Sequence, residues 1–183
     1  KKNPKVLLII PAYNEEKNIL TVYKNICDYN KKAKTKLDVV FINDGSVDAT
    51  EKILCENKIN HIKLIQNLGI GGAVQTGYKY ALYNDYDIAI QFDGDGQHQA
   101  KYLKNLVKEI EDGNANIVIG SRFVTEKKPF TARMLGSRII AFFTKITTGK
   151  TIKDTTSGMR AYDRNAIKEF VTNTSLTPEP DTM

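Results

Sequence analysis

Five short aliphatic runs, each followed by polar or glycine-rich residues and most by a helical pattern, constrain the fold of this chain most strongly. The runs are Val6 to Ile10, Leu37 to Ile42, Ile62 to Ile65, Ile88 to Phe92 and Ile117 to Ile119. Because each run is brief and favours β structure, it is typical of a buried strand rather than of a helix. Strands that alternate with helices predict an α/β fold, with a mainly parallel sheet and helices on both of its faces.

The segments between these runs predict helices. We expect one helix to follow the polar loop Ala12 to Glu16 and to end near Lys32, and others from Ala73 to about Tyr83, from about Ala100 to Asp112 and from near Arg164. A further helix follows the second strand, with Ser46 or Asp48 placed to cap it. Pro11 is expected to end the first strand. Four loops, at residues 11–15, 43–46, 67–72 and 93–98, are then expected at one edge of the sheet, where open α/β sheets bind their ligands.

Length, charge and cysteine content limit the classes of protein that need to be considered. The 183 residues are enough for one domain with a sizeable core, and we expect residues 1–183 to be one domain cut short at its C-terminus. The sequence has no span long enough to cross a bilayer and no secretion signal, which favours the cytoplasm. The net charge of +6 favours binding to phosphates, nucleotides or an anionic membrane face. Nucleic acid is not favoured as a partner, because the sequence has no aromatic-rich ladder on which bases could stack. Cys27 and Cys55 lack metal-ligand spacing and are interpreted as reduced packing residues.

Two acidic residues, Asp93 and Asp95, follow the fourth predicted strand directly. Because the two residues are two positions apart, their carboxylates point the same way in an extended segment. Gly94 and Gly96 let a ligand approach the backbone. Such hard oxygen ligands suit Mg2+, which takes one or two carboxylates and completes its shell with water and substrate phosphates. Gln97 adds a neutral oxygen. A plain acidic turn is the alternative, but the position at a strand end favours a metal site.

A glycine-rich turn, Gly69 to Gly72, precedes the helix that follows the third strand. It resembles a dinucleotide-binding fingerprint only weakly, because Val74 occupies the last glycine position and the turn does not follow the first strand. A glycine-rich turn at a helix N-terminus can still receive a phosphate through its backbone N–H groups.

Four segments, in this order, resemble glycosyltransferase family 2. They are Ile10-Pro11-Ala12-Tyr13-Asn14-Glu15-Glu16, Asn43-Asp44-Gly45-Ser46-x-Asp48-x-Thr50, Asp93-Gly94-Asp95-Gly96-Gln97-His98 and Gly120-Ser121-Arg122. The resemblance covers nearly the whole chain and is closest to dolichol-phosphate mannose synthases and bacterial polyprenyl-phosphate glycosyltransferases. It implies a GT-A fold and inverting transfer of a hexose or N-acetylhexosamine from a UDP- or GDP-sugar. The implied acceptor is polyprenyl phosphate at the inner, cytoplasmic face of the membrane.

The resemblance also implies a role for individual residues. The nucleotide-sugar donor would be bound by Pro11, Ala12, Tyr13, Asn14, Glu15, Asp44, Gly72, Asp93, Gly94 and Asp95. Asp93 and Asp95 would be the catalytic residues and, with Gln97, would hold Mg2+ or Mn2+ against the diphosphate, where the cation neutralises charge on the leaving group. Arg122, Arg133 and Ser137 would hold the acceptor phosphate, which guanidinium groups bind well. Because that acceptor is already an anion, it would need no general base.

Two segments near the C-terminus keep more than one interpretation. The predicted helix from Ala132 to about Thr147 carries an apolar stripe of Leu135, Ile139, Phe142, Phe143 and Ile146. This stripe fits either core packing or an interfacial helix that dips into a membrane. The segment Asp154 to Arg160 matches a family segment near the sugar and the acceptor, and a structural turn at Ser157-Gly158 is the simpler role.

Three other functions compete with polyprenyl-phosphate glycosylation. A polysaccharide or glycan glycosyltransferase with a hydroxyl acceptor would need a general base, for which Glu179 and Asp181 are the candidates. A non-catalytic sugar-nucleotide-binding domain would bind the donor without turnover. A nucleotidyltransferase is less favoured, because its glycine-rich basic loop should follow the first strand, where this chain has Pro11 to Glu15.

Overall fold

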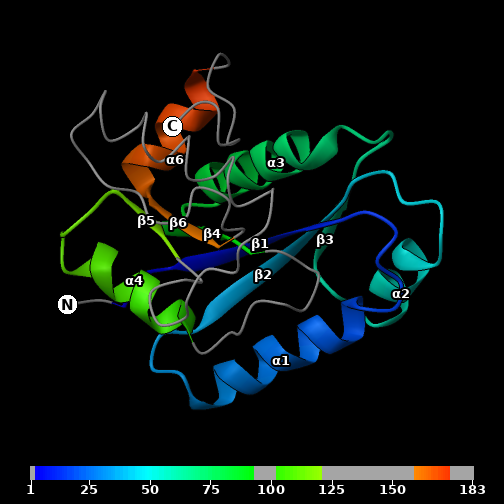
Figure 1. Cartoon of the computed structure of the whole chain (residues 1–183), viewed down its shortest axis with the longest axis horizontal. Helices are drawn as coiled ribbons and strands as arrows, with labels where there is room; N and C mark the ends of the chain where they lie inside the picture. The colour runs from blue at the N-terminus through cyan, green and yellow to red at the C-terminus, as the bar shows by residue number, and fades with distance from the viewer. Residues whose placement is uncertain (1–2, 93–101, 121–158, 174–183) are drawn as a thin grey trace, which may run out of the picture.

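A six-stranded sheet forms the centre of the protein (Figure 1). The computed structural model describes residues 3–92, 102–120 and 159–173, and every structural statement below concerns these residues. The strand order is β3-β2-β1-β4-β6-β5. The strands are β1 (Val6–Ala12), β2 (Leu37–Asn43), β3 (His61–Lys63), β4 (Ile88–Gln91), β5 (Ile117–Ile119) and β6 (Arg160–Asp163). Only β6 runs antiparallel to its neighbours, so the predicted mainly parallel α/β sheet is confirmed.

Helices cover both faces of this sheet. They are α1 (Ile19–Lys32), α2 (Thr50–Glu56), α3 (Gly69–Tyr83), α4 (Leu103–Glu111) and α6 (Arg164–Thr172). In Figure 1, α3 and α6 lie over one face, whereas α1 and α4 lie under the other. The aliphatic run of β1 is buried both ways, since Leu8 and Ile10 join the core that includes residues of α1 and α4, while Leu7 and Ile9 join the core of α3 and α6. A strand covered on both faces is continuously apolar for this reason.

The close approach of α3 to β1 depends on Gly77. A Cβ at this position would lie 2.3 Å from Ile9 Cγ2, far inside normal contact distance. The glycine therefore lets the helix backbone pack directly onto the centre of the sheet.

Several predicted boundaries were wrong. Pro11 does not end the first strand: β1 continues to Ala12, with Pro11 opposite Ile42 of β2. The proline is tolerated because the pairing of β4 with β1 ends at Ile9. Pro11, which has no N–H to donate, lies beyond the last residue of β1 that pairs with β4. The strand β6, within a segment interpreted as carrying a turn, was not predicted.

Other predictions about elements also need correction. The third strand is His61–Lys63 rather than Ile62 to Ile65, and Ile65 is fully exposed. The helix α3 begins at Gly69, so the predicted glycine-rich turn is its first turn. Both cysteines are free, as predicted, but Cys55 is exposed, so its interpretation as a packing residue was wrong.

Some predicted features lie outside the described residues. These are Asp93, Gly94, Asp95, Gln97, Arg122, Arg133, Ser137, Glu179, Asp181, the helix from Ala132 to about Thr147 and the turn at Ser157-Gly158. Among the helices that are described, none combines the length and the apolar character that a membrane span requires.

Candidate functional site

Asp44, which follows β2, is hydrogen-bonded to the end of β1 and to the loop after β3. Its backbone N–H donates to the carbonyl of Ala12 at 2.9 Å, and its Oδ1 accepts from the N–H of Leu68 at 2.7 Å. The side chain is only 4% exposed. Among the described residues, the Leu68 amide is the one donor to this carboxylate. A buried carboxylate with acceptor capacity to spare favours a ligand that brings N–H or O–H groups.

Gly45 allows the loop after β2 to lie against the backbone of the loop after β3. Its φ of +70° is in the left-handed region, and a Cβ there would lie 2.7 Å from the nitrogen of Asn67 and 2.8 Å from the carbonyl carbon of Gln66. Both the conformation and the contact require glycine. The position of Asp44 relative to Leu68 is therefore set by backbone packing as well as by the hydrogen bond.

Asn14 connects the first two loops by two reciprocal hydrogen bonds. Its N–H donates to Ser46 Oγ at 3.0 Å, and its Oδ1 accepts from the N–H of Val47 at 2.9 Å. The residue has a φ of 55°, a conformation that asparagine adopts more readily than most residues. Tyr13 immediately before it is 48% exposed, so its ring can cover a ligand at this edge.

A second set of hydrogen bonds joins the start of the loop after β1 to the start of α2. The N–H of Glu15 donates to Thr50 Oγ1 at 2.9 Å and that of Glu16 to Asp48 Oδ2 at 3.2 Å, while Glu16 Oε2 accepts from Ala49 N–H at 3.0 Å. Burial disfavours the charged form of Asp48, but hydrogen bonds from Thr50 and from the Glu16 amide outweigh it and keep the pKa of this carboxyl below its usual value. Asp48 also accepts from the Thr50 N–H at 2.9 Å, although the N-cap position is Ala49.

Gly72 lies in the first turn of α3, and its visible role is packing. A Cβ at Gly72 would lie 2.5 Å from the Cβ of Leu68, whose amide donates to Asp44. Gly69 opens the helix with a φ of +75° and nothing close to its missing Cβ. The first turn of this helix thus lies beside the Asp44 carboxylate, with its N–H groups directed away from the helix body.

The predicted donor-site residues that are described lie along one edge of the sheet. Five of them, Pro11, Ala12, Tyr13, Asn14 and Glu15, end or follow β1, Asp44 follows β2, and Gly72 lies in the first turn of α3 after β3. The hydrogen bonds above bring the loops after β1, β2 and β3 together. The predicted metal ligands and acceptor-phosphate residues lie outside the described residues.

Sequence reasoning did not find two buried polar residues at the end of β4. Gln91 is 6% exposed and Arg160 of β6 is 4% exposed, and the two are register partners. The Oε1 of Gln91 is buried and has no hydrogen-bond partner in the described part of the chain. Arginine is seldom fully buried without a functional or structural partner. The available signal was an arginine within the short run Met159 to Tyr162, which directly follows the predicted turn at Ser157-Gly158.

Most of the sequence matches one protein family. The match is to glycosyl transferase family 2 and extends over residues 7–171. The chain belongs to this family. A UDP-N-acetylglucosamine–dolichyl-phosphate N-acetylglucosaminyltransferase of Methanococcus voltae is 35% identical to this family 2 chain over 184 residues, which cover 89% of the chain and 71% of the relative. A polyprenol monophosphomannose synthase of Mycolicibacterium smegmatis is 26% identical over 175 residues, covering 91% and 64% respectively.

Solved structures agree on the fold of this family 2 chain. Glucosyl-3-phosphoglycerate synthase from Mycobacterium tuberculosis, in complex with Mn2+, UDP-glucose and phosphoglyceric acid, superposes with a TM-score of 0.68 at 19% identity. The match covers 88% of this chain and 57% of that structure, so the chain spans little more than half of it. The predicted GT-A fold is confirmed, and so is the predicted family.

Proposed function

We propose that this family 2 domain transfers a sugar, with inversion, from a nucleoside-diphosphate sugar to polyprenyl phosphate. The observation that carries the proposal is the buried carboxylate of Asp44, which follows β2 and accepts from the Leu68 N–H of the loop after β3, at the edge where β1, β2 and β4 end. A nucleoside offers the N–H and O–H donors that such a carboxylate binds. Asp93 and Asp95 follow β4 in the sequence, and we expect them at this edge, where the diphosphate of a donor bound at Asp44 would need a cation.

The nucleotide half of the donor would bind among the loops that the hydrogen bonds connect. Asp44 would accept from the base or the ribose, the exposed ring of Tyr13 would cover the nucleoside, and Asn14 would hold the two loops in place. We favour a UDP-sugar over a GDP-sugar, because the Methanococcus relative is named for UDP-N-acetylglucosamine and the mycobacterial structure contains UDP-glucose. An N-acetylhexosamine is then the first sugar to test.

Metal dependence follows from the chemistry of the residues after β4. The strand ends at Gln91, whose buried side-chain Oε1 has no hydrogen-bond partner among the described residues. Asp93, Asp95 and Gln97 follow it in the sequence. This set of hard oxygens fits Mg2+ or Mn2+. When bound, the cation would neutralise the charge that develops on the leaving diphosphate. Asp93 and Asp95 would be the residues that hold and orient it.

The acceptor half of the site is proposed for the residues after β5. Arg122, Arg133 and Ser137 would bind the phosphate of the lipid, and the buried Arg160 adds positive charge beside the end of β4. A phosphate acceptor attacks as an anion, so the domain needs no general base. The curated relatives named for dolichyl phosphate and polyprenol support this acceptor class. Contact with the inner face of the membrane is part of the same proposal, because the lipid acceptor resides there.

The test is a transfer assay with matched acceptors. The chain is incubated with Mn2+ and UDP-N-acetylglucosamine, UDP-glucose or GDP-mannose, and with a short polyprenyl phosphate, the corresponding polyprenol or no acceptor. We expect a glycolipid product with the phosphate and none with the alcohol. Transfer to a hydroxyl acceptor instead would favour the polysaccharide alternative, with Glu179 or Asp181 as base. Donor binding without any transfer would favour the non-catalytic alternative.

A further inference from the structure

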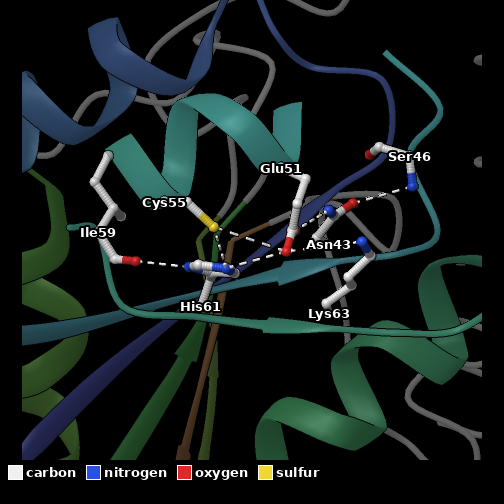
Figure 2. Close-up of polar contacts among 7 residues, drawn as sticks. All are labelled: Asn43, Ser46, Glu51, Cys55, Ile59, His61 and Lys63. Carbon is white, nitrogen blue, oxygen red and sulfur yellow. Dashed lines mark hydrogen bonds and ion pairs between the residues drawn. The ribbon is translucent and has the colours of Figure 1, made fainter. Parts of the chain in front are cut away.

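Three side chains able to bind a metal meet between α2 and β3, away from the predicted Asp93 site in the sequence (Figure 2). They are Glu51 and Cys55 on α2 and His61, the first residue of β3. Glu51 and Cys55 are four residues apart and therefore lie on one face of the helix. Figure 2 shows the carboxylate, the thiol and the imidazole pointing toward one another.

The spacing of the three ligand atoms is close to that of a tetrahedral zinc site. His61 Nε2 lies 3.5 Å from Glu51 Oε1 and 3.7 Å from Cys55 Sγ, and Cys55 Sγ lies 3.9 Å from Glu51 Oε1. Zinc bonds of ordinary length at tetrahedral angles separate such atoms by about 3.3–3.6 Å. Each pair would therefore need to close by only about 0.1–0.3 Å around the ion.

The surrounding hydrogen bonds orient two of the three ligands. The Nδ1 of His61 lies 2.7 Å from the carbonyl oxygen of Ile59, and because a carbonyl only accepts, Nδ1 is the donor. The lone pair of the neutral ring is then on Nε2, which faces Glu51 and Cys55. Asn43 Nδ2 donates to Glu51 Oε2 at 2.6 Å and leaves Oε1 facing the other two ligands. Such contacts to the outer atoms of ligands are typical of metal sites in proteins.

We propose that Glu51, Cys55 and His61 form a binding site for Zn2+ or a chemically similar divalent ion. Sulfur and imidazole nitrogen select zinc-class ions, whereas Mg2+ and Mn2+ prefer all-oxygen sites such as Asp93 and Asp95. Because Cys55 is exposed, a water can complete the tetrahedron. This proposal departs from the interpretation of Cys55 as lacking metal-ligand spacing, because its partner His61 follows on the next strand.

Lys63 is the one described cation that competes for this cluster. Its Nζ lies 3.9 Å from Glu51 Oε1, but its side chain is 58% exposed and can turn into solvent when an ion binds.

The site is connected to the loop that carries Asp44. Asn43, which holds Glu51, also accepts at its Oδ1 from the N–H of Ser46 at 3.0 Å. Figure 2 shows this side chain between the ion-binding cluster and Ser46. A bound ion would thus brace α2, β3 and the loop after β2 as one unit.

Cobalt substitution gives a direct test, because a thiolate bound to Co2+ produces a near-ultraviolet charge-transfer band that oxygen and nitrogen ligands do not. We expect titration with Co2+ to give this band in the wild type and in Cys27→Ser, and to lose it in Cys55→Ser. Cys27 is a matched control, since it is a free cysteine on α1 outside the cluster. Excess Mg2+ should leave the band, whereas Zn2+ should remove it.

A second measurement uses zinc itself and tests the role of the Glu51 carboxylate. Competition with a zinc indicator should show binding weakened at least about 10- to 100-fold by Glu51→Gln, with Glu56→Gln on the same helix as the control. Zn2+ should also raise the thermal midpoint of the wild type more than that of Cys55→Ser. The proposal is overturned if the wild type shows no cobalt band, if Cys55→Ser keeps it, or if Glu51→Gln and Glu56→Gln bind zinc equally well.

Discussion

Replacing Gly45 with alanine should destabilise the protein through two separable effects. The backbone φ of +70° costs an alanine about 1–2 kcal/mol, and a Cβ placed 2.7 Å from Asn67 N and 2.8 Å from Gln66 C adds a steric cost of about 1–3 kcal/mol. Together we expect a loss of about 3 kcal/mol of unfolding free energy. Gly113→Ala is the matched control, because Gly113 has a φ of +73° but nothing within 4 Å of its missing Cβ. It should cost only about 1–2 kcal/mol.

Urea unfolding of the two variants and the wild type measures both losses, and their difference isolates the steric contact between the loops. Nucleotide titration of the same proteins tests the functional consequence. Gly45→Ala should weaken nucleotide binding, because the displaced loop carries Asp44 away from Leu68, whereas Gly113→Ala should bind as the wild type does. Equal losses of stability in the two variants would refute the contact, and unchanged nucleotide affinity in Gly45→Ala would refute the role of the loop.

Three further substitutions test other parts of the structure. Asp44→Asn should weaken nucleotide binding by about 10- to 100-fold, measured by calorimetry, because charged hydrogen bonds contribute about 1.5–3 kcal/mol; Asp38→Asn, at the far end of β2, should not. Asp48→Asn should lower the unfolding free energy near neutral pH. Since the folded pKa of Asp48 is depressed, this difference from the wild type should shrink as the pH falls below about 4, and a pH-independent difference would contradict the assignment. Gly77→Ala should lose about 1–3 kcal/mol by clashing with Ile9, and the double variant with Ile9→Ala should lose less than the sum of the two single changes.

The parallel sheet could be predicted because its strands are continuous apolar runs. Residues such as Leu7 and Leu8 are buried on opposite faces, so the pattern follows directly from the helices on both sides. The loops that carry Asn14 and Asp44 could be located because parallel strands end at one edge. The strand β6 could not, because its four residues include Arg160, and a short segment with a charged residue carries no clear period.

The hydrogen bonds of the candidate site, and the contacts among Glu51, Cys55 and His61, join residues from different segments of the chain. Nothing local indicates that Asn14 bonds to Ser46 or that Asp44 bonds to Leu68, since these contacts arise from the order of the strands. The same reason explains why Cys55 was not linked to His61. Their spacing of six residues includes the end of a helix and a turn, and only the fold shows that the turn brings β3 back beside α2.

Calorimetric titration of UDP, with and without Mn2+, into the wild type and Asp95→Ala tests the central claim most directly. GDP serves as the comparison nucleotide. We expect UDP to bind the wild type in a metal-dependent manner, GDP to bind more weakly and Asp95→Ala to lose the metal-dependent part of the affinity while remaining folded. Failure of both nucleotides to bind the folded wild type in the presence of Mn2+, or equal binding by Asp95→Ala, would contradict the assignment of residues 93–97 to a metal-dependent nucleotide-sugar site.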